Sequence, residues 1–348
     1  MLTETSAATV IEEIAEQFKA KPFAPYRLFK HGDLQTLSAY FWPARFRARD
    51  LTEDDERLFA VEPGSQVLAR CRWQTNRATQ PTLLIWHGLG GSTASAYMLT
   101  TADKAFRAGF NVVRVNIRNC ADTEHLTPTL SHAGLTADLR AVIDELISRD
   151  HLSRLLVAGF SLGGNLVLKL IGEYGEQVPP EIRGACAVSP SVDLRASTDL
   201  ISQPRNWIYH QTFLRRLHRR VRVKAKLFPA LYDTNGLEQI RSIEQFDNRY
   251  VAPVFGFADA SDYYAQASSL PFISRIRLPT LVIHAQDDPF IPFAPLRDPA
   301  IAANPYVLLL APERGGHVAF VSANSTGEDR FWAENRLLEF CAAVSRLA

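Results

Sequence analysis

The feature that most constrains this fold is a serine flanked by glycines where an apolar run ends. Residues 155–165 read LLVAGFSLGGN. In a Gly-x-Ser-x-Gly turn the serine has a strained backbone between strand and helix, and side chains at the glycine positions would collide with both elements. The strain exposes the hydroxyl of Ser161 and places the N–H of Leu162 at a helix N-terminus, where it can stabilise an oxyanion. The alternative is a glycine-rich turn with an N-capping serine, so the rest of the chain must decide.

Apolar runs of strand length alternate with helical patterns through most of the chain. The strand-like runs are residues 81–87, 111–117, 154–160, 184–189, 279–285 and 306–311. They show little polar alternation, which predicts a mostly parallel sheet with helices on both faces. Between them, apolar residues recur at spacings of three and four after Leu135 and after Ser161. Upstream, a strand pair turning at Pro63-Gly64 is expected to form an antiparallel edge.

Composition excludes several classes of protein. The chain has 348 residues, of which 47% are hydrophobic, enough for a large core. The 38 Lys and Arg balance 37 Asp and Glu, so no global field favours nucleic acid or an acidic membrane. The four cysteines are far apart, the N-terminus is acidic, and no apolar run approaches the about 18 residues that span a bilayer. We therefore expect a soluble protein of the reducing cytoplasm.

A serine nucleophile needs a base and an acid, which follow it in the order Ser, Asp, His on this architecture. His317 follows the last predicted strand behind two glycines that let its loop approach the serine. The acid comes from the adjacent pair Asp287 and Asp288, of which we favour Asp288 because the following proline biases it to an extended backbone. Asp287 would then cap the loop. Asp193, after the preceding core strand, is an alternative acid.

The stretch WHGLGGS, residues 86–92, supplies the second half of an oxyanion hole. Its loop is expected to turn the N–H of Leu89 toward the site that Leu162 also faces. A phosphate or dinucleotide loop is the weaker alternative, because the spacing is not G-x-G-x-x-G. His87 is expected to pack and hydrogen-bond locally. His125 and His132 lack further ligands, so neither a metal nor a cofactor is predicted.

A segment between two core strands differs in composition from the rest. Residues 196–261, rich in arginine and aromatic residues, are predicted to form a helical cap between core parts 51–195 and 262–348, and residues 1–50 an N-terminal extension packed on the core. The cap sequence FLRRLHRRVRVKAKLF holds seven Lys and Arg. A helix with a solvated basic face explains it most simply. A transient contact with an anionic membrane surface is an alternative, whereas no motif supports nucleic acid binding.

Several of these stretches together resemble the YheT-type α/β-hydrolases, a group of ester hydrolases and ethanol acyltransferases. The resemblance rests on HGLGGS, GFSLGGN, FDNRYVAPVFGFADASDYY and AQDDPFIP, and HGDLQTL at residues 31–37 extends it over nearly the whole chain. It implies an α/β-hydrolase fold with Ser161, Asp288 and His317 as the catalytic triad. One departure is Asn119, where relatives commonly have glycine; because asparagine tolerates a left-handed backbone, we expect the shape to be kept.

These observations predict a serine carboxylesterase. Its substrate would be a small-molecule ester with a short or medium acyl chain, and the reaction would pass through an acyl-enzyme. The alternatives are a lipase or phospholipase, an alcohol acyltransferase, and a hydrolase-fold binding protein without catalysis. Aromatic residues of the cap would line the acyl pocket.

Overall fold

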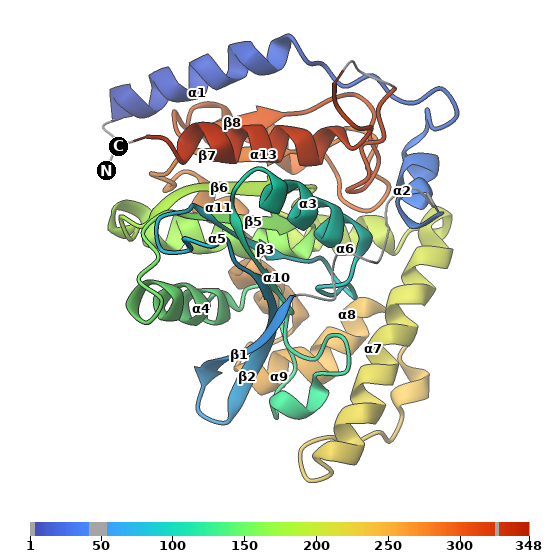
Figure 1. Cartoon of the computed structure of the whole chain (residues 1–348). Coiled ribbons are helices and arrows are strands. Elements are labelled where there is room, and N and C mark those ends of the chain that lie inside the picture. Colours follow the sequence, from blue (N-terminus) through green and yellow to red (C-terminus); the bar gives the residue numbers. More distant parts are fainter. Residues whose placement is uncertain (1–3, 42–53, 324–326, 348) are drawn as a thin grey trace.

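The computed structural model describes residues 4–41, 54–323 and 327–347. Its centre is an eight-stranded sheet with the order β1-β2-β4-β3-β5-β6-β7-β8 (Figure 1). The strands are β1 Asp55–Glu62, β2 Ser65–Arg72, β3 Thr82–Trp86, β4 Asn111–Val115, β5 Leu155–Phe160, β6 Ile182–Val188, β7 Thr280–Ile283 and β8 Val307–Leu310. The predicted α/β-hydrolase fold is confirmed, and each apolar run named from the sequence overlaps one strand.

The two antiparallel strands lie at one edge of the sheet. β1 pairs with β2 across a turn in which Gly64 has a φ of +76°, a conformation that glycine adopts without strain. β2 also runs antiparallel to β4, and the other neighbouring pairs are parallel. The parallel strands therefore end at a common edge of the sheet, and their following loops meet there.

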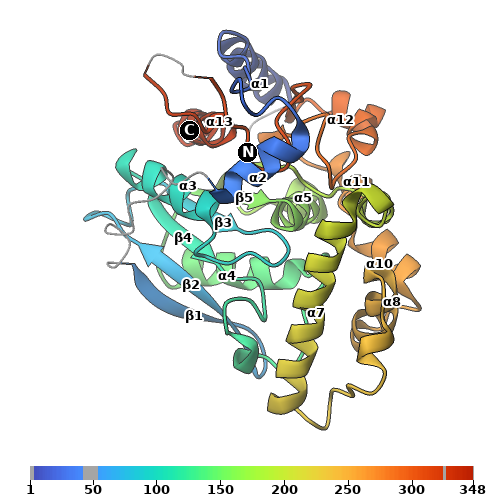
Figure 2. The same cartoon turned by 90° about the vertical axis from the view of Figure 1, so that its right-hand side faces the viewer.

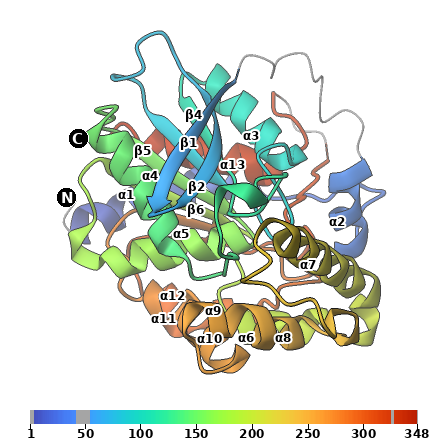
Figure 3. The ribbon, with the colours of Figure 1, turned by 90° about the horizontal axis from the view of Figure 1, so that it is seen from below.

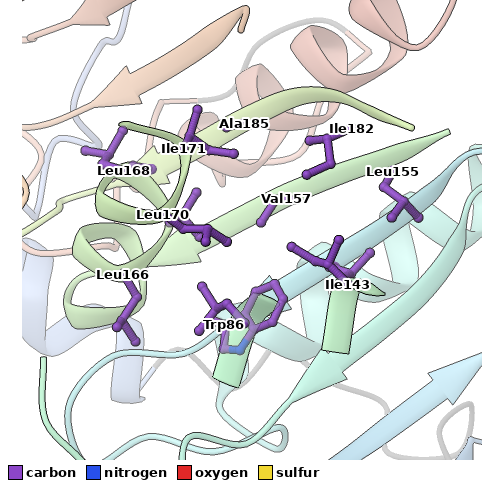
Figure 4. Packing of buried hydrophobic residues seen from close by; sticks show 14 of the residues in the cluster. Trp86, Ile143, Leu155, Val157, Leu166, Leu168, Leu170, Ile171, Ile182 and Ala185 are labelled. Atoms are coloured by element: carbon purple, nitrogen blue, oxygen red, sulfur yellow. The ribbon is translucent and has the colours of Figure 1, made fainter. Parts of the chain in front are cut away.

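Helices cover both faces of the sheet because its central strands are buried on both sides. On β3, Leu83 and Ile85 pack with α1, α3 and α13, whereas Leu84 and Trp86 pack with α4 and α5 (Figures 1 and 4). Because successive side chains of a strand point to opposite faces of the sheet, alternate residues of β3 belong to separate apolar cores. The helices are α1 Glu4–Lys19, α3 Ala96–Arg107, α4 Thr136–Ser148, α5 Leu162–Tyr174 and α13 Trp332–Val344.

The chain between β6 and β7 forms a group of helices that includes α7 (Figure 3). Its buried residues form a third apolar cluster together with Leu130 and Ala133. Its elements are α6 Leu194–Ile201, α7 Trp207–Leu227, α8 Ile243–Phe246, a π-helical turn Asp247–Val251, α9 Ala252–Phe255, α10 Ala260–Ala267 and α11 Leu270–Ile273. The predicted limits of the cap fall inside α6 and α10, and the division into cap and core stays a prediction. Across the described ranges, no helix is long and apolar enough to cross a membrane.

The N-terminal segment lies against the core in two places. α1 contributes Ile11, Ile14 and Phe18 to the cluster that also contains residues of α13. Further on, α2, Gly32–Phe41, lies near the start of α7, where Tyr209 Oη and Asp33 Oδ1 are 3.3 Å apart (Figures 1 and 2). The last residues of the predicted extension, 42–50, are outside the described residues.

We predict that Gly163→Ala destabilises the fold far more than Gly164→Ala. A Cβ on Gly163 would lie 2.5 Å from the carbonyl oxygen of Trp86, and backbone cannot move aside cheaply, whereas the nearest atom to a Cβ on Gly164 is 3.1 Å away. We expect the free energy of unfolding to fall by about 2–3 kcal/mol in the first variant and to change by less than about 1 kcal/mol in the second. Urea denaturation measures both, and equal effects would contradict the prediction.

Candidate active site

The strand-to-helix turn after β5 presents Ser161 at the edge of the sheet. The residue has φ 54° and ψ −118°, outside the regions that a side chain prefers, and its N–H donates to the carbonyl of Val188 at 2.8 Å. A Cβ on Gly159 would lie 2.1 Å from the carbonyl oxygen of Gly163. The glycines are thus required for the reason that the motif suggested, namely backbone contact on both sides of the serine.

His87, at the start of the loop after β3, has a local role, as expected from the sequence. Its Nδ1 donates to the carbonyl of Gly88 at 2.8 Å, and its Nε2 accepts from the N–H of Ile117 at 3.1 Å. Burial lowers the pKa of this fully buried imidazole to about 4, so it is neutral at physiological pH. His87 therefore fixes the loop and leaves no nitrogen for catalysis.

These contacts also set the direction of the Leu89 N–H. The carbonyl of Gly88 accepts from His87 Nδ1 and from the N–H of Gly91 at 3.0 Å. In a trans peptide the following N–H points away from that carbonyl, so the Leu89 N–H is directed to the other side. The loop lies close to the serine, because a Cβ on Gly88 would come within 2.8 Å of the Ser161 Cβ. Leu89 and Leu162 both line the cavity that contains Ser161.

The structure brings His317 and Asp288 into contact. Nδ1 of the imidazole donates to Oδ2 of the carboxylate at 2.7 Å, and Oδ1 accepts from the N–H groups of Phe290 and Ile291 at 2.8 and 3.0 Å. Burial alone would raise the pKa of Asp288, but the charge and hydrogen bond of His317 outweigh it and lower the pKa below its ordinary value. Asp288 therefore stays ionised and fixes the orientation of the imidazole.

The other two acid candidates have different partners. Asp287 accepts a hydrogen bond from the N–H of Gly316 at 2.9 Å, and burial raises its pKa. Asp193 caps α6 by accepting from the N–H of Ala196 at 2.9 Å. Of the three carboxylates proposed from the sequence, Asp288 is the one that contacts His317.

The loop that carries His317 depends on the N-terminal helix α2. Gly316 and Val318, on either side of the histidine, have φ values of +61° and +68°. Thr36 of α2 accepts a hydrogen bond from the N–H of His317 at 2.9 Å and donates to the carbonyl of Gly32 at 2.7 Å. The stretch HGDLQTL marked this helix in the sequence, but nothing local to it indicated contact with the base.

Two further residues of α2 fix it against the loops that carry His317 and Asp288. The buried Gln35 accepts from the N–H of Val321 at 2.8 Å and donates to the Val321 and Phe29 carbonyls at 3.0 and 2.8 Å. Gly32 contacts the acid loop so closely that a Cβ there would lie 2.0 Å from the carbonyl oxygen of Asp287. α2 therefore joins the acid loop and the base loop.

A cavity of about 410 Å³ connects these elements. Ser161 and His317 line it from the core, and Phe213 and Leu217 of α7 line it from the opposite side. The volume lies within the range of small-molecule sites, ~300–1,000 Å³. In the described structure no hydrogen bond joins Ser161 to His317, a contact that free enzymes often hold loosely.

One polar group in this cavity was not recognised from the sequence. Asp247, in the π-helical turn, is 8% exposed and accepts a hydrogen bond from Tyr264 Oη at 2.7 Å. Burial raises its pKa to about 7. π-helical turns occur frequently at functional sites. The sequence of this turn, FDNRYVAP, has no pattern by which a π-helical turn can be recognised.

Asn119 keeps the left-handed backbone expected at its position, with a φ of +62°. The side chain also donates to the carbonyl of Thr129 at 3.1 Å. The departure from the family pattern therefore preserves the shape of the turn after β4.

With fold and site described, the chain can be placed among known proteins. It belongs to the alpha/beta hydrolase fold family, whose model matches residues 81–323. It is 30% identical over 321 residues to the Escherichia coli (strain K12) protein named "Putative esterase YheT", an alignment that covers 90% of this chain and 91% of the relative. These matches confirm the resemblance found in the sequence.

Other relatives share part of their length. A monoacylglycerol lipase of Saccharomyces cerevisiae is 33% identical over 75% of this chain and 59% of its own length. Among solved structures, the Pyrococcus furiosus esterase Pf2001 superimposes with a TM-score of 0.53 at 18% identity, covering 85% of this chain and 94% of that one; this likeness shows the fold alone. The chain is thus an esterase- or lipase-type α/β-hydrolase.

We predict that Thr36→Val lowers kcat by about tenfold or more with little change in KM, because a small displacement of a catalytic group is costly. Valine keeps the shape of threonine but cannot accept from the His317 N–H. Thr36→Ser keeps the acceptor and should restore kcat to within about twofold, since the hydrogen bond is retained. Steady-state kinetics on 4-nitrophenyl butyrate measures both; equal activity of the two variants would contradict the role.

Proposed function

We propose that this protein is a serine hydrolase that cleaves carboxylic esters of short- to medium-chain acyl groups through an acyl-enzyme. Ser161 is the nucleophile, His317 the general base and acid, and Asp288 the residue that orients and stabilises the imidazolium. The N–H groups of Leu89 and Leu162 bind the oxyanion. The observation that carries the proposal is the 2.7 Å contact between His317 and Asp288 at the cavity where Ser161 has its strained backbone.

The reaction has two halves. Ser161 Oγ attacks the ester carbonyl while His317 Nε2 takes its proton, and the tetrahedral oxyanion collapses to the acyl-enzyme as the imidazolium protonates the leaving alcohol. Water then attacks the acyl-enzyme, with its proton passing to His317. The acid is released when Ser161 regains the proton. An alcohol in place of water would give acyl transfer by the same steps, which is the first alternative.

A second alternative is a lipase or phospholipase. The monoacylglycerol lipase among the relatives supports it. The apolar cavity wall from α7, with Phe213 and Leu217, suits an acyl chain in either case. A rate profile against acyl length, with and without anionic vesicles, distinguishes an esterase from a lipase that acts at a surface, and it tests the alternative of a transient membrane contact.

A hydrolase-fold binding protein is the alternative from outside enzymology. The buried and ionised Asp288 argues against it, because a binding protein needs no charge beneath a histidine. Retention of a strained serine argues against it as well, since strain persists where a function requires it.

The test of the proposal is Ser161→Ala. We expect loss of fluorophosphonate labelling and a fall of about 10⁴-fold or more in the rate of 4-nitrophenyl butyrate hydrolysis, as for other triad nucleophiles. The fold should be unchanged by circular dichroism. Labelling retained in this variant would refute the assignment of the nucleophile.

We predict that Asp288→Asn lowers kcat by about 10³ to 10⁴-fold, because the amide favours the wrong histidine tautomer. Asp287→Asn is the matched control, since that side chain contacts the N–H of Gly316 and not the imidazole. Its effect should be far smaller. The reverse ranking would transfer the role to Asp287, and two near-normal variants would point to Asp193.

We propose further that the segment 196–261 acts as a cap that sets acyl-chain preference without taking part in bond cleavage. Leu217 and Phe246 line the cavity from this segment and belong to its apolar cluster. Each methylene buried against them contributes about 0.8 kcal/mol to binding. Residues of the cap therefore determine which acyl chain length binds, whereas Ser161 and His317 belong to the core.

Accordingly, Leu217→Trp should shift the preferred acyl chain to shorter esters and leave acetate hydrolysis within about threefold of wild type, because a narrower pocket excludes methylenes first. Ile208→Trp, at a 71% exposed position of the same helix, is the control. A panel of 4-nitrophenyl esters from acetate to decanoate measures the profile. An unchanged profile in Leu217→Trp would contradict a role for the segment in specificity.

A further inference from the structure

Two arginines of α7 lie in the wall of the active-site cavity. Arg216 and Arg220 are four residues apart, one helical turn, so they share a face of the helix. Both line the cavity that contains Ser161 and His317, whereas Arg215 does not. The basic run in the sequence therefore has two members that face the site.

Within the described ranges, neither of these cations, Arg216 or Arg220, has a carboxylate partner. Other cations of the helix do have partners in the protein. These are Arg219 with Asp122 at 3.5 Å, Arg222 with Glu238, and Lys224 with the carbonyls of Glu124 and Thr127.

The contacts of Arg216 place its charge beside the oxyanion loop. Its Nη1 donates to the carbonyl of Gly90 at 3.1 Å. Gly90 has a φ of +68°, and a Cβ there would lie 2.8 Å from the same Nη1. The glycine therefore permits this close approach, and a guanidinium has further N–H groups for a ligand.

Arg220 is close to a neutral group. Its Nη2 lies 3.4 Å from the sulfur of Cys120, a weak acceptor, and burial raises the pKa of that thiol so that it stays protonated. Elsewhere in the cavity, burial lowers the pKa of His132 to about 4 and leaves it uncharged. The wall formed by α7 is thus positively charged.

We propose that Arg216 and Arg220 form a subsite for an anionic group, a carboxylate or a phosphate, carried on the ester substrate. This inference rests on the proposed function, since it names the class of ester that the site prefers. A guanidinium pair matches the oxygens of either anion and donates charge-assisted hydrogen bonds to them. Asp247, in another part of the wall, contacts neither arginine among its hydrogen bonds.

The test is binding of three probes of equal chain length to Ser161→Ala, measured by calorimetry. The probes are octyl phosphate, octanoate and neutral 1-octanol. We expect at least one anion to bind about tenfold or more tightly than the alcohol, as charge-assisted hydrogen bonds imply. Adding Arg216→Gln and Arg220→Gln together should remove most of this preference. Adding Arg215→Gln, on the same helix outside the cavity, should preserve it.

The two anions distinguish the two classes of anionic substrate. A preference for octyl phosphate alone indicates an ester that carries a phosphate, and a preference for octanoate alone indicates an ester that carries a carboxylate. Anions that bind no better than the alcohol, or a preference that survives both arginine substitutions, would overturn the subsite. If the double substitution prevents folding, the preference for the anions over 1-octanol is measured on Ser161→Ala alone at increasing salt concentration. A preference based on these charges must decline as ionic strength rises.

The proposed function is tested by a separate result. It is refuted if wild-type protein hydrolyses no ester of the 4-nitrophenyl panel, whatever the binding data show. Hydrolysis without an anion preference refutes the subsite and leaves the esterase assignment intact.

Discussion

The structure depends on one backbone contact that only glycine permits. Where β5 turns into α5, Gly163 approaches the end of β3 so closely that a Cβ would lie 2.5 Å from the Trp86 carbonyl. This approach forces the positive φ of Ser161 and places the loop after β3 directly beside its side chain. Ser161 and the loop after β3, the proposed nucleophile and oxyanion loop, are consequently positioned by one packing constraint. The core on both sides of β3 supplies the energy that maintains the strain.

His317 and Asp288, the proposed base and acid, depend on a second constraint, which comes from the N-terminal helix α2. Their loops follow different strands, and α2 contacts both: Gly32 lies against Asp287, and Thr36 accepts from the N–H of His317. Thr36, which is 281 residues from His317 in sequence, thereby limits the freedom of the loop that carries this histidine. Preorganisation of this kind reduces the reorganisation that the reaction would otherwise require.

Much of the fold could be predicted because its signals are local. Strand-length apolar runs such as 279–285 and the turn at Gly64 identify their elements without reference to distant residues. The contact of Asp288 with His317 was also expected, because strand ends meet at one edge. The support from Thr36, the burial of Asp247 and the division of cations on α7 were not predictable, because each depends on which distant loop lies opposite a given side chain.

The position of α7 connects the fold to the wall of the cavity. Its buried Lys224 donates to the carbonyls of Glu124 and Thr127, and burial lowers the pKa of this amine to about 8. Such a contact joins α7 (Figure 2) to the segment around Glu124 and Thr127 without an ion pair. Leu217 and Arg216 of the same helix line the cavity. The turn at Ser161 cannot vary without losing its geometry, whereas side chains on α7 can. If α7 sets substrate preference as proposed, that preference can change on this helix while Ser161 and His317 remain the same.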